Sequence, residues 1–223
     1  MLKLSQAQSE VFIPDAFPSC QALERTTHLG IVAHPDDIEF MGWHPILECI
    51  ENEKFWLTGV IVSDGRSSPR SGMYEHLGDQ EMVALRLKEQ HYAGVVGGYA
   101  ACIHLMHSEQ GKLLAESDLH EFENLVEDLK QSIQATRPSV VFTHNLADSH
   151  PHHTLVALAS IRALRELGPD YYPLEFYGGE VWRSLDWMPL HDKLAFDVGQ
   201  HQNLTASLTA VCAATWAAVT TAQ

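Results

Sequence analysis

The sequence predicts an α/β fold, a mostly parallel β-sheet covered by helices on both faces. Short apolar runs rich in β-branched residues alternate with longer stretches whose apolar residues recur at helical spacing. The short runs are continuously apolar, as is typical of strands buried on both faces. Strands that alternate with helices form βαβ units, and such units build a parallel sheet.

Four segments predict the central strands: residues 29–33, 55–62, 101–106 and 139–142. Helices are predicted over residues 42–53, 79–96, 119–136 and 154–167, the last of which stops before Gly168-Pro169. Two further strands are expected at residues 174–182 and 194–198. A C-terminal packing helix is expected from the helical spacing of Leu204, Leu208, Val211, Thr215 and Val219. The polar loop over residues 64–78 is long enough to overhang a ligand site.

Composition limits the classes of partner. The 223 residues carry 14 Lys+Arg against 29 Asp+Glu, a net charge of -15, which repels nucleic acid and anionic membrane surfaces. No run reaches the 18 or so apolar residues of a membrane span, and no signal peptide is recognisable, so we expect a cytoplasmic location. The four cysteines form no paired motif, which favours free thiols. This length predicts one domain over residues 1–223 that acts on a small molecule.

The first predicted strand ends in a polar motif, His34-Pro35-Asp36-Asp37-Ile38-Glu39. In an open parallel sheet, ligands bind beyond the carboxyl ends of the strands. His34 and Asp37 are three residues apart across a turn, so both can face one ion while Asp36 lies beside them. Zinc accepts this mixture of imidazole nitrogen and carboxylate oxygen. Aspartate at such a junction also caps helices, so this motif alone leaves that alternative open.

A second motif follows the fourth predicted strand and therefore lies at the same edge of the sheet. Four of the fourteen histidines fall between His144 and His153. His150 and His153 are three residues apart before a helix, as His34 and Asp37 are. Two such clusters at matching positions predict a shared metal site.

Together the two motifs resemble those of the LmbE-like (PIG-L) superfamily of zinc-dependent N-deacetylases, and the resemblance runs from about residue 29 to residue 198. It implies a Rossmann-like fold and the removal of acetyl groups from N-acetylglucosamine-containing compounds or related amides. It also implies Zn²⁺ as cofactor, with His34, Asp37 and His153 as ligands. Asp36 would be the general base, and His150 would stabilise the oxyanion or act as an acid.

The resemblance extends to a helix in which Arg86 and Glu89 match an Arg-x-x-Glu pattern, whose arginine can face substrate; a solvated helix face is the alternative for Arg86. Two positions depart from the family. His152 replaces the aspartate of a His-Pro-Asp-His pattern, and Asp148 is close enough in sequence to supply the missing carboxylate. The segment Ser108-Glu109-Gln110-Gly111 stands where relatives often carry Asp-Gly.

Two other functions remain open from the sequence. A metal-dependent phosphoesterase also uses His/Asp clusters at strand ends, although a two-metal site needs more bridging carboxylates than the motifs supply. A catalytically silent metal-binding or sugar-binding module is suggested by His152. The substrate and a possible homo-oligomeric state are not determined by the sequence.

Overall fold

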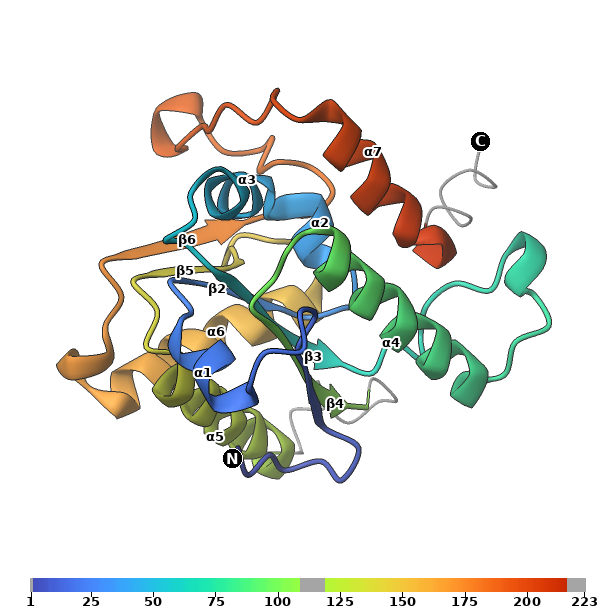
Figure 1. Cartoon of the computed structure of the whole chain (residues 1–223), viewed down its shortest axis with the longest axis horizontal. Helices are drawn as coiled ribbons and strands as arrows, with labels where there is room; N and C mark the ends of the chain where they lie inside the picture. The colour runs from blue at the N-terminus through green and yellow to red at the C-terminus, as the bar shows by residue number, and fades with distance from the viewer. Residues whose placement is uncertain (1, 109–118, 216–223) are drawn as a thin grey trace.

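The computed structural model describes residues 2–108 and 119–215 and contains one six-stranded sheet (Figure 1). The strand order is β1-β4-β3-β2-β5-β6, in which only β1 pairs antiparallel to its neighbour. The strands are β1 (Glu10–Phe12), β2 (His28–Val32), β3 (Leu57–Ser63), β4 (Ala101–His107), β5 (Val140–His144) and β6 (Glu175–Gly179). The predicted α/β class with a mostly parallel sheet is confirmed.

Helices cover both faces of the sheet, as Figure 1 shows. The helices are α1 (Ser19–Glu24), α2 (Asp37–Met41), α3 (Trp43–Glu51), α4 (Asp79–Val96), α5 (Leu119–Thr136), α6 (Pro151–Leu167) and α7 (Gln202–Val211). One apolar core packs Ile31 and Ile103 against α1, α5 and α6, and the other packs Val32 and Cys102 against α2, α3, α4 and α7. Neighbouring strand residues point to opposite faces, and both faces are apolar because both are covered.

The strand order places a switch point beside the central strand β2. The chain runs from β2 outward through β3 and β4, then returns to β5 on the other side of β2 and ends the sheet at β6. Ligands of open α/β sheets bind at such a point, beyond the carboxyl ends of the two strands. Both sequence motifs begin there.

The elements predicted from residues 29 to 182 are present, with boundaries shifted by a few residues. The prediction of a strand over residues 194–198 is wrong, because these residues form no strand. Phe196 instead stacks on His44, with ring centroids 3.8 Å apart, so apolar contacts rather than strand pairing hold the segment. Helix α7 is present but ends before Cys212; Val219 lies outside the described residues. The sequence reasoning missed β1, α1 and α2.

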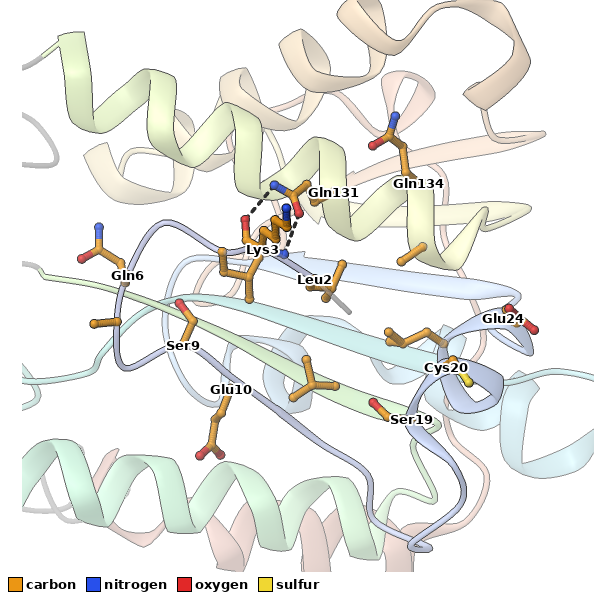
Figure 2. Close-up of a pocket in the computed structure, with 15 residues that line it drawn as sticks. Leu2, Lys3, Gln6, Ser9, Glu10, Ser19, Cys20, Glu24, Gln131 and Gln134 are labelled. Carbon is orange, nitrogen blue, oxygen red and sulfur yellow. Dashed lines mark hydrogen bonds between the residues drawn. The ribbon is translucent and has the colours of Figure 1, made fainter.

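Two pockets of the described structure are considered as possible ligand sites. The larger, about 960 Å³, lies between the N-terminal segment and helices α1 and α5 (Figure 2). The other, about 660 Å³, lies at the switch point and contains both histidine motifs. In the described part of the chain, no helix is both long and apolar enough to cross a membrane.

Candidate metal centre and active site

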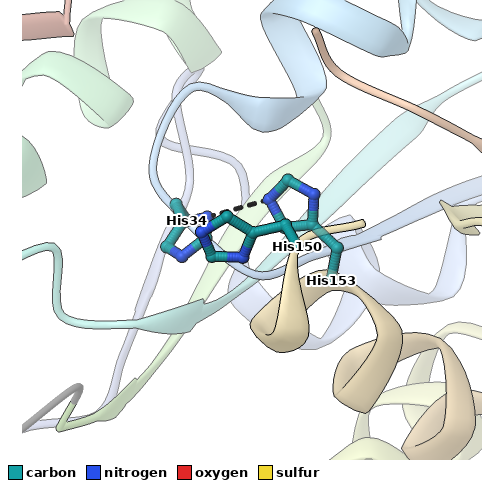
Figure 3. A group of neighbouring side chains, drawn as sticks. All are labelled: His34, His150 and His153. Carbon is teal, nitrogen blue, oxygen red and sulfur yellow. Dashed lines mark hydrogen bonds between the residues drawn. The ribbon is translucent and has the colours of Figure 1, made fainter. Parts of the chain in front are cut away.

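The switch point brings together side chains from β2, α2, β5 and α6. His34 lies two residues beyond the end of β2, and Asp37 is the first residue of α2. His150 precedes α6, and His153 lies in its first turn. Figure 3 shows the rings of His34, His150 and His153 gathered beside the start of α6. The two motifs, more than a hundred residues apart, therefore form one cluster.

Three ligand atoms of this cluster face one another. His34 Nδ1 lies 3.2 Å from Asp37 Oδ2 and 3.2 Å from His153 Nε2, and His153 Nε2 lies 3.6 Å from Asp37 Oδ2. Ligands bound tetrahedrally to zinc at 2.0–2.1 Å lie about 3.3 Å from one another. The three residues therefore fit a zinc ion with little movement and leave a fourth position for water or substrate, as a catalytic site requires.

Neighbouring groups orient the two imidazoles. His153 Nδ1 donates to Asp148 Oδ2 at 2.8 Å, so the lone pair of Nε2 faces the cluster. His34 Nε2 lies 3.1 Å from His152 Nδ1, on the other side of the ring from Asp37. The substituted position, His152, therefore contacts the ring of His34, and Asp148 contacts the ring of His153.

The charges of the cluster suit metal binding. Burial lowers the pKa of His153 to about 4, which keeps the imidazole neutral and able to ligate. Burial alone would raise the pKa of Asp37, but the imidazoles of His34 and His144 outweigh it and hold that pKa well below its ordinary value. Asp37 is therefore an ionised carboxylate among imidazoles.

His144 is a member of the cluster to which the sequence reasoning gave no role. It is the last residue of β5 and is buried, and its Nε2 accepts the backbone N–H of Ala33 at 2.9 Å. The same nitrogen lies 3.3 Å from Asp37 Oδ2, and its ring stacks on that of His153 at 3.9 Å. His144 joins the ends of β2 and β5 and packs against His153, one of the predicted ligands. The sequence does contain a signal for His144: it is the last residue of the strand that precedes the second histidine motif.

Asp36 lies next to Asp37 in the chain, beside the three predicted ligand residues, and its carboxylate is hydrogen-bonded by Arg86 and Thr215. Asp36 is buried and has a left-handed backbone conformation, with φ 87°. Its backbone N–H donates to Gln90 Oε1 at 2.8 Å, and its Oδ2 accepts from Arg86 at 2.6 Å and from the hydroxyl of Thr215. Burial raises the pKa of Asp36, and the adjacent guanidinium opposes this shift. Strained backbone of this kind is typical of functional sites.

Arg86 lines the pocket, and its guanidinium is hydrogen-bonded to other groups of the protein. Its guanidinium donates to Asp36, to Glu89 Oε2 at 2.6 Å and to the carbonyl of Pro35. It is 1% exposed, so the alternative of a solvated helix face is wrong. This geometry makes Arg86 a support beneath Asp36.

Glu39, the last acidic residue of the first motif, faces away from the cluster. Its Oε1 accepts from Tyr99 Oη at 2.7 Å and from Gln90 Nε2 at 2.9 Å. Burial raises its pKa to about 7. Glu39 therefore joins α2 to α4 rather than contributing a ligand.

His150 and the surrounding walls complete the pocket. The backbone N–H of His150 donates to Asp148 Oδ1 at 2.8 Å, and its Nδ1 is buried without a hydrogen-bond partner among the described residues. Burial lowers the pKa of His150, as does the adjacent His34. Ser67, Ser68 and Pro69 of the long polar loop over residues 64–78 line the pocket, and so does Trp182. Of the segment Ser108-Glu109-Gln110-Gly111, only Ser108 is among the described residues.

Comparisons with known proteins agree with this geometry. Residues 29–164 match the family model described as PIG-L, GlcNAc-PI de-N-acetylase. That range contains every site residue discussed above except Trp182 and Thr215. A comparison with curated protein sequences gave no match.

Solved structures share the fold at low identity. N,N'-diacetylchitobiose deacetylase from Pyrococcus horikoshii is 17% identical, with a TM-score of 0.65 over 85% of this chain and 70% of that chain. The zinc-inhibited form of teicoplanin deacetylase Orf2 is 16% identical, with a TM-score of 0.58 over 86% and 84%. GalB, the 4-carboxy-2-hydroxymuconate hydratase from Pseudomonas putida KT2440, is 16% identical, with a TM-score of 0.57 over 83% and 84%. At these identities the likeness establishes the fold alone.

Proposed function

Because the chain belongs to the PIG-L (GlcNAc-PI de-N-acetylase) family, we propose that it is a zinc-dependent hydrolase that removes an acetyl group from a small, sugar-like amide. The observation that carries this proposal is the convergence of His34 Nδ1, Asp37 Oδ2 and His153 Nε2 within 3.2–3.6 Å. A buried carboxylate, that of Asp36, lies beside them in the same pocket. This set supplies three ligands and a separate base.

His34, Asp37 and His153 would hold the zinc ion. When bound, zinc supplies a Lewis acid and brings the pKa of water toward about 7. Asp36 takes the proton of the attacking water. Its Oδ1 is the oxygen for this step, because Arg86 and Thr215 both bond Oδ2. The hydrogen bond from Arg86 fixes the orientation of the Asp36 carboxylate, so that Asp36 stays beside the predicted metal ligands and does not become one of them.

Hydrolysis of the amide then needs two further contributions. As water adds to the carbonyl carbon, negative charge develops on the carbonyl oxygen, and His150 lies at the pocket wall to donate to it. When the C–N bond breaks, the proton taken by Asp36 passes to the departing nitrogen, directly or through His150. The products are acetate and a free amine.

The walls of the pocket favour a neutral, ring-shaped substrate. Trp182 is 54% exposed and offers an aromatic face, of the kind on which the apolar side of a sugar ring packs. Ser67 and Ser68 also line the pocket and bring hydroxyl groups to it. The volume of about 660 Å³ suits a ligand of one or two sugar rings.

The phosphoesterase alternative is less well supported. Arg86 is already paired with Asp36 and Glu89, so its charge is balanced before a phosphate arrives. Asp148 is engaged with His153, and Asp36 is held by Arg86, so the described residues of the cluster supply fewer bridging carboxylates than a two-metal site needs. The shared fold of GalB is a reminder that fold alone does not select the reaction.

The proposal is tested by amine release from a panel of N-acetylated sugars, with zinc content measured on the same samples. We expect release from at least one N-acetylated sugar, loss of activity with a chelator and recovery on adding zinc. Asp36→Asn should keep zinc and lower turnover by roughly 10² to 10⁴. His153→Ala should lower both zinc affinity and turnover.

The matched control is His201→Ala, which removes a histidine paired with Glu51 far from the pocket motifs in sequence. This variant should retain activity and active-site zinc. Near-normal turnover in zinc-loaded Asp36→Asn would rule out the base assignment. Phosphate release from phosphoesters without amine release from any acetylated sugar would favour the alternative function.

A further inference from the structure

A second group of possible metal ligands lies at the edge of the sheet formed by β1 and β4, away from the switch point. Glu10 of β1 is directly opposite His104 of β4 in the antiparallel pair. His91 reaches the same place from α4, and one ligand atom from each of the three residues lies within 4.8 Å of the others. None of the three lines the pocket at the switch point.

His104 carries a buried ring nitrogen that no contact within the described protein satisfies. It is 2% exposed, and its Nε2 has no hydrogen-bond partner among the described residues. A buried polar atom without a partner costs free energy, so native structures rarely keep one without a ligand, water or ion. Glu10 Oε1 and His91 Nε2 lie 2.5 Å apart and pair with each other, and that contact does not satisfy His104.

We propose that Glu10, His91 and His104 bind a second divalent metal ion of the zinc class, which fastens β1 to β4 and α4. Two imidazoles and one carboxylate are a common ligand set for zinc. Burial, together with the neighbouring His91, lowers the pKa of His104 to about 3, so its imidazole is neutral and its lone pair is available. The ring of His91 is held in place by Phe12, which stacks on it at 4.0 Å.

The ligand atoms need a modest rearrangement to bind. Tetrahedral ligands lie about 3.3 Å apart, so the Glu10 and His91 atoms must separate while His104 stays in place. The side chains of Glu10 and His91 are 40% and 26% exposed, which gives them room to move. Figure 2 shows the carboxylate of Glu10 pointing away from Lys3 and Gln131, the residues on the far side of the larger pocket. The partial exposure also gives an ion access from solvent.

The consequence is structural. Strand β1 is three residues long and pairs with β4 alone, so few hydrogen bonds hold it. An ion shared by β1, β4 and α4 would bind the folded edge and not the unfolded chain, which stabilises the folded edge by mass action. Zinc should therefore slow hydrogen exchange at the amides of β1.

The test uses the full chain, stripped of metal and titrated with Zn²⁺ by calorimetry, with Co²⁺ absorption as a second readout. We expect two zinc ions per chain. Glu10→Gln and His91→Phe should each lose one binding event, or weaken it at least about 10-fold, while His153→Ala should lose the other. Both edge substitutions are at partly exposed positions, and His91→Phe keeps an aromatic ring against Phe12.

The matched control is Glu51→Gln, which breaks another carboxylate–histidine pair, Glu51 with His201 at 2.9 Å, that has no third ligand in the described structure. It should keep both binding events. The edge site is refuted if Glu10→Gln and His91→Phe bind zinc as the unmodified chain does. It is also refuted if zinc leaves exchange at the amides of β1 unchanged. A single zinc that is lost in Glu10→Gln and retained in His153→Ala would support the edge site and contradict the proposed catalytic centre.

Discussion

Substitution of Arg86 would test whether the buried charges of Arg86, Asp36 and Glu89 stabilise the fold together. The guanidinium of Arg86 donates to Asp36 and Glu89 at 2.6 Å each, and all three side chains are buried. Arg86→Met keeps most of the side-chain length but leaves two buried carboxylates without their cation. Removing one partner of a buried ion pair costs about 3–5 kcal/mol. We therefore expect the free energy of unfolding to fall by about that amount at pH 8.

The assay is denaturant unfolding with a chelator present for every variant. The double variant Arg86→Met with Asp36→Asn should be more stable than Arg86→Met alone, because one unpaired charge has been removed. The matched control is Arg162→Met. Arg162 also donates to two carboxylates, those of Glu123 and Glu166, but it is exposed to solvent, so its loss should change stability little.

The pH dependence of this variant follows from the same charges. Burial raises the pKa of both Asp36 and Glu89, and removing the guanidinium takes away the group that opposes this shift. A carboxylate whose pKa is higher in the folded than in the unfolded state favours folding when protonated. The destabilisation of Arg86→Met should therefore shrink as the pH falls from 8 to 6. Equal effects for Arg86→Met and Arg162→Met, or no recovery in the double variant, would refute the reasoning.

Three further substitutions or measurements address the ligand supports and the thiols. Asp148→Asn removes the charge that holds the Nδ1 proton of its imidazole partner, so zinc affinity should fall roughly 10-fold in equilibrium dialysis, and unchanged affinity would refute this role. His152→Asp gives the ring of His34 a carboxylate partner and should tighten zinc binding; weaker binding would show that the imidazole is the better partner. Burial raises the pKa of Cys49 to about 12, so Cys49 should alkylate at least about 100-fold more slowly than exposed Cys20 at pH 8, with a rate that rises about tenfold per pH unit; similar rates by peptide mass spectrometry would contradict this.

The strands and helices that the sequence predicted well are those with a strong local pattern. The continuous apolar runs of β2, β3 and β4 and the periodic segment of α5 are buried where the pattern required it. Helix α4 is present, but the face that it buries carries Arg86, Glu89 and Gln90, whereas Tyr92 and Val96, which follow the apolar spacing, are exposed. Strand β1 was missed because its three residues have no such pattern and depend on pairing with β4. The segment over residues 194–198 has apolar residues, but Phe196 packs by ring contacts on His44 and on Tyr177 of β6 and the segment forms no strand, so its pattern was misleading.

The sequence predicted which residue types gather at the site, but not all of their contacts. His144 was left without a role because its importance depends on the register between β2 and β5, which places its ring against His153. The resemblance implied that Arg86 can face substrate; Arg86 does line the pocket, and α4 also packs it against Asp36, a contact that the sequence did not predict. A side chain of that length reaches several partners, and only the packing of α4 selects among them.

The sequence by itself determined the class of fold, the edge of the sheet where chemistry gathers, and the family. It did so because strand periodicity and motif position are local properties that survive without coordinates. The tertiary structure decided which nitrogen of each imidazole faces the ligand cluster, which carboxylate supports which ring, and that Glu10 meets two histidines from β4 and α4. These contacts join residues from separate elements, and their distances are fixed only when both faces of the sheet are packed.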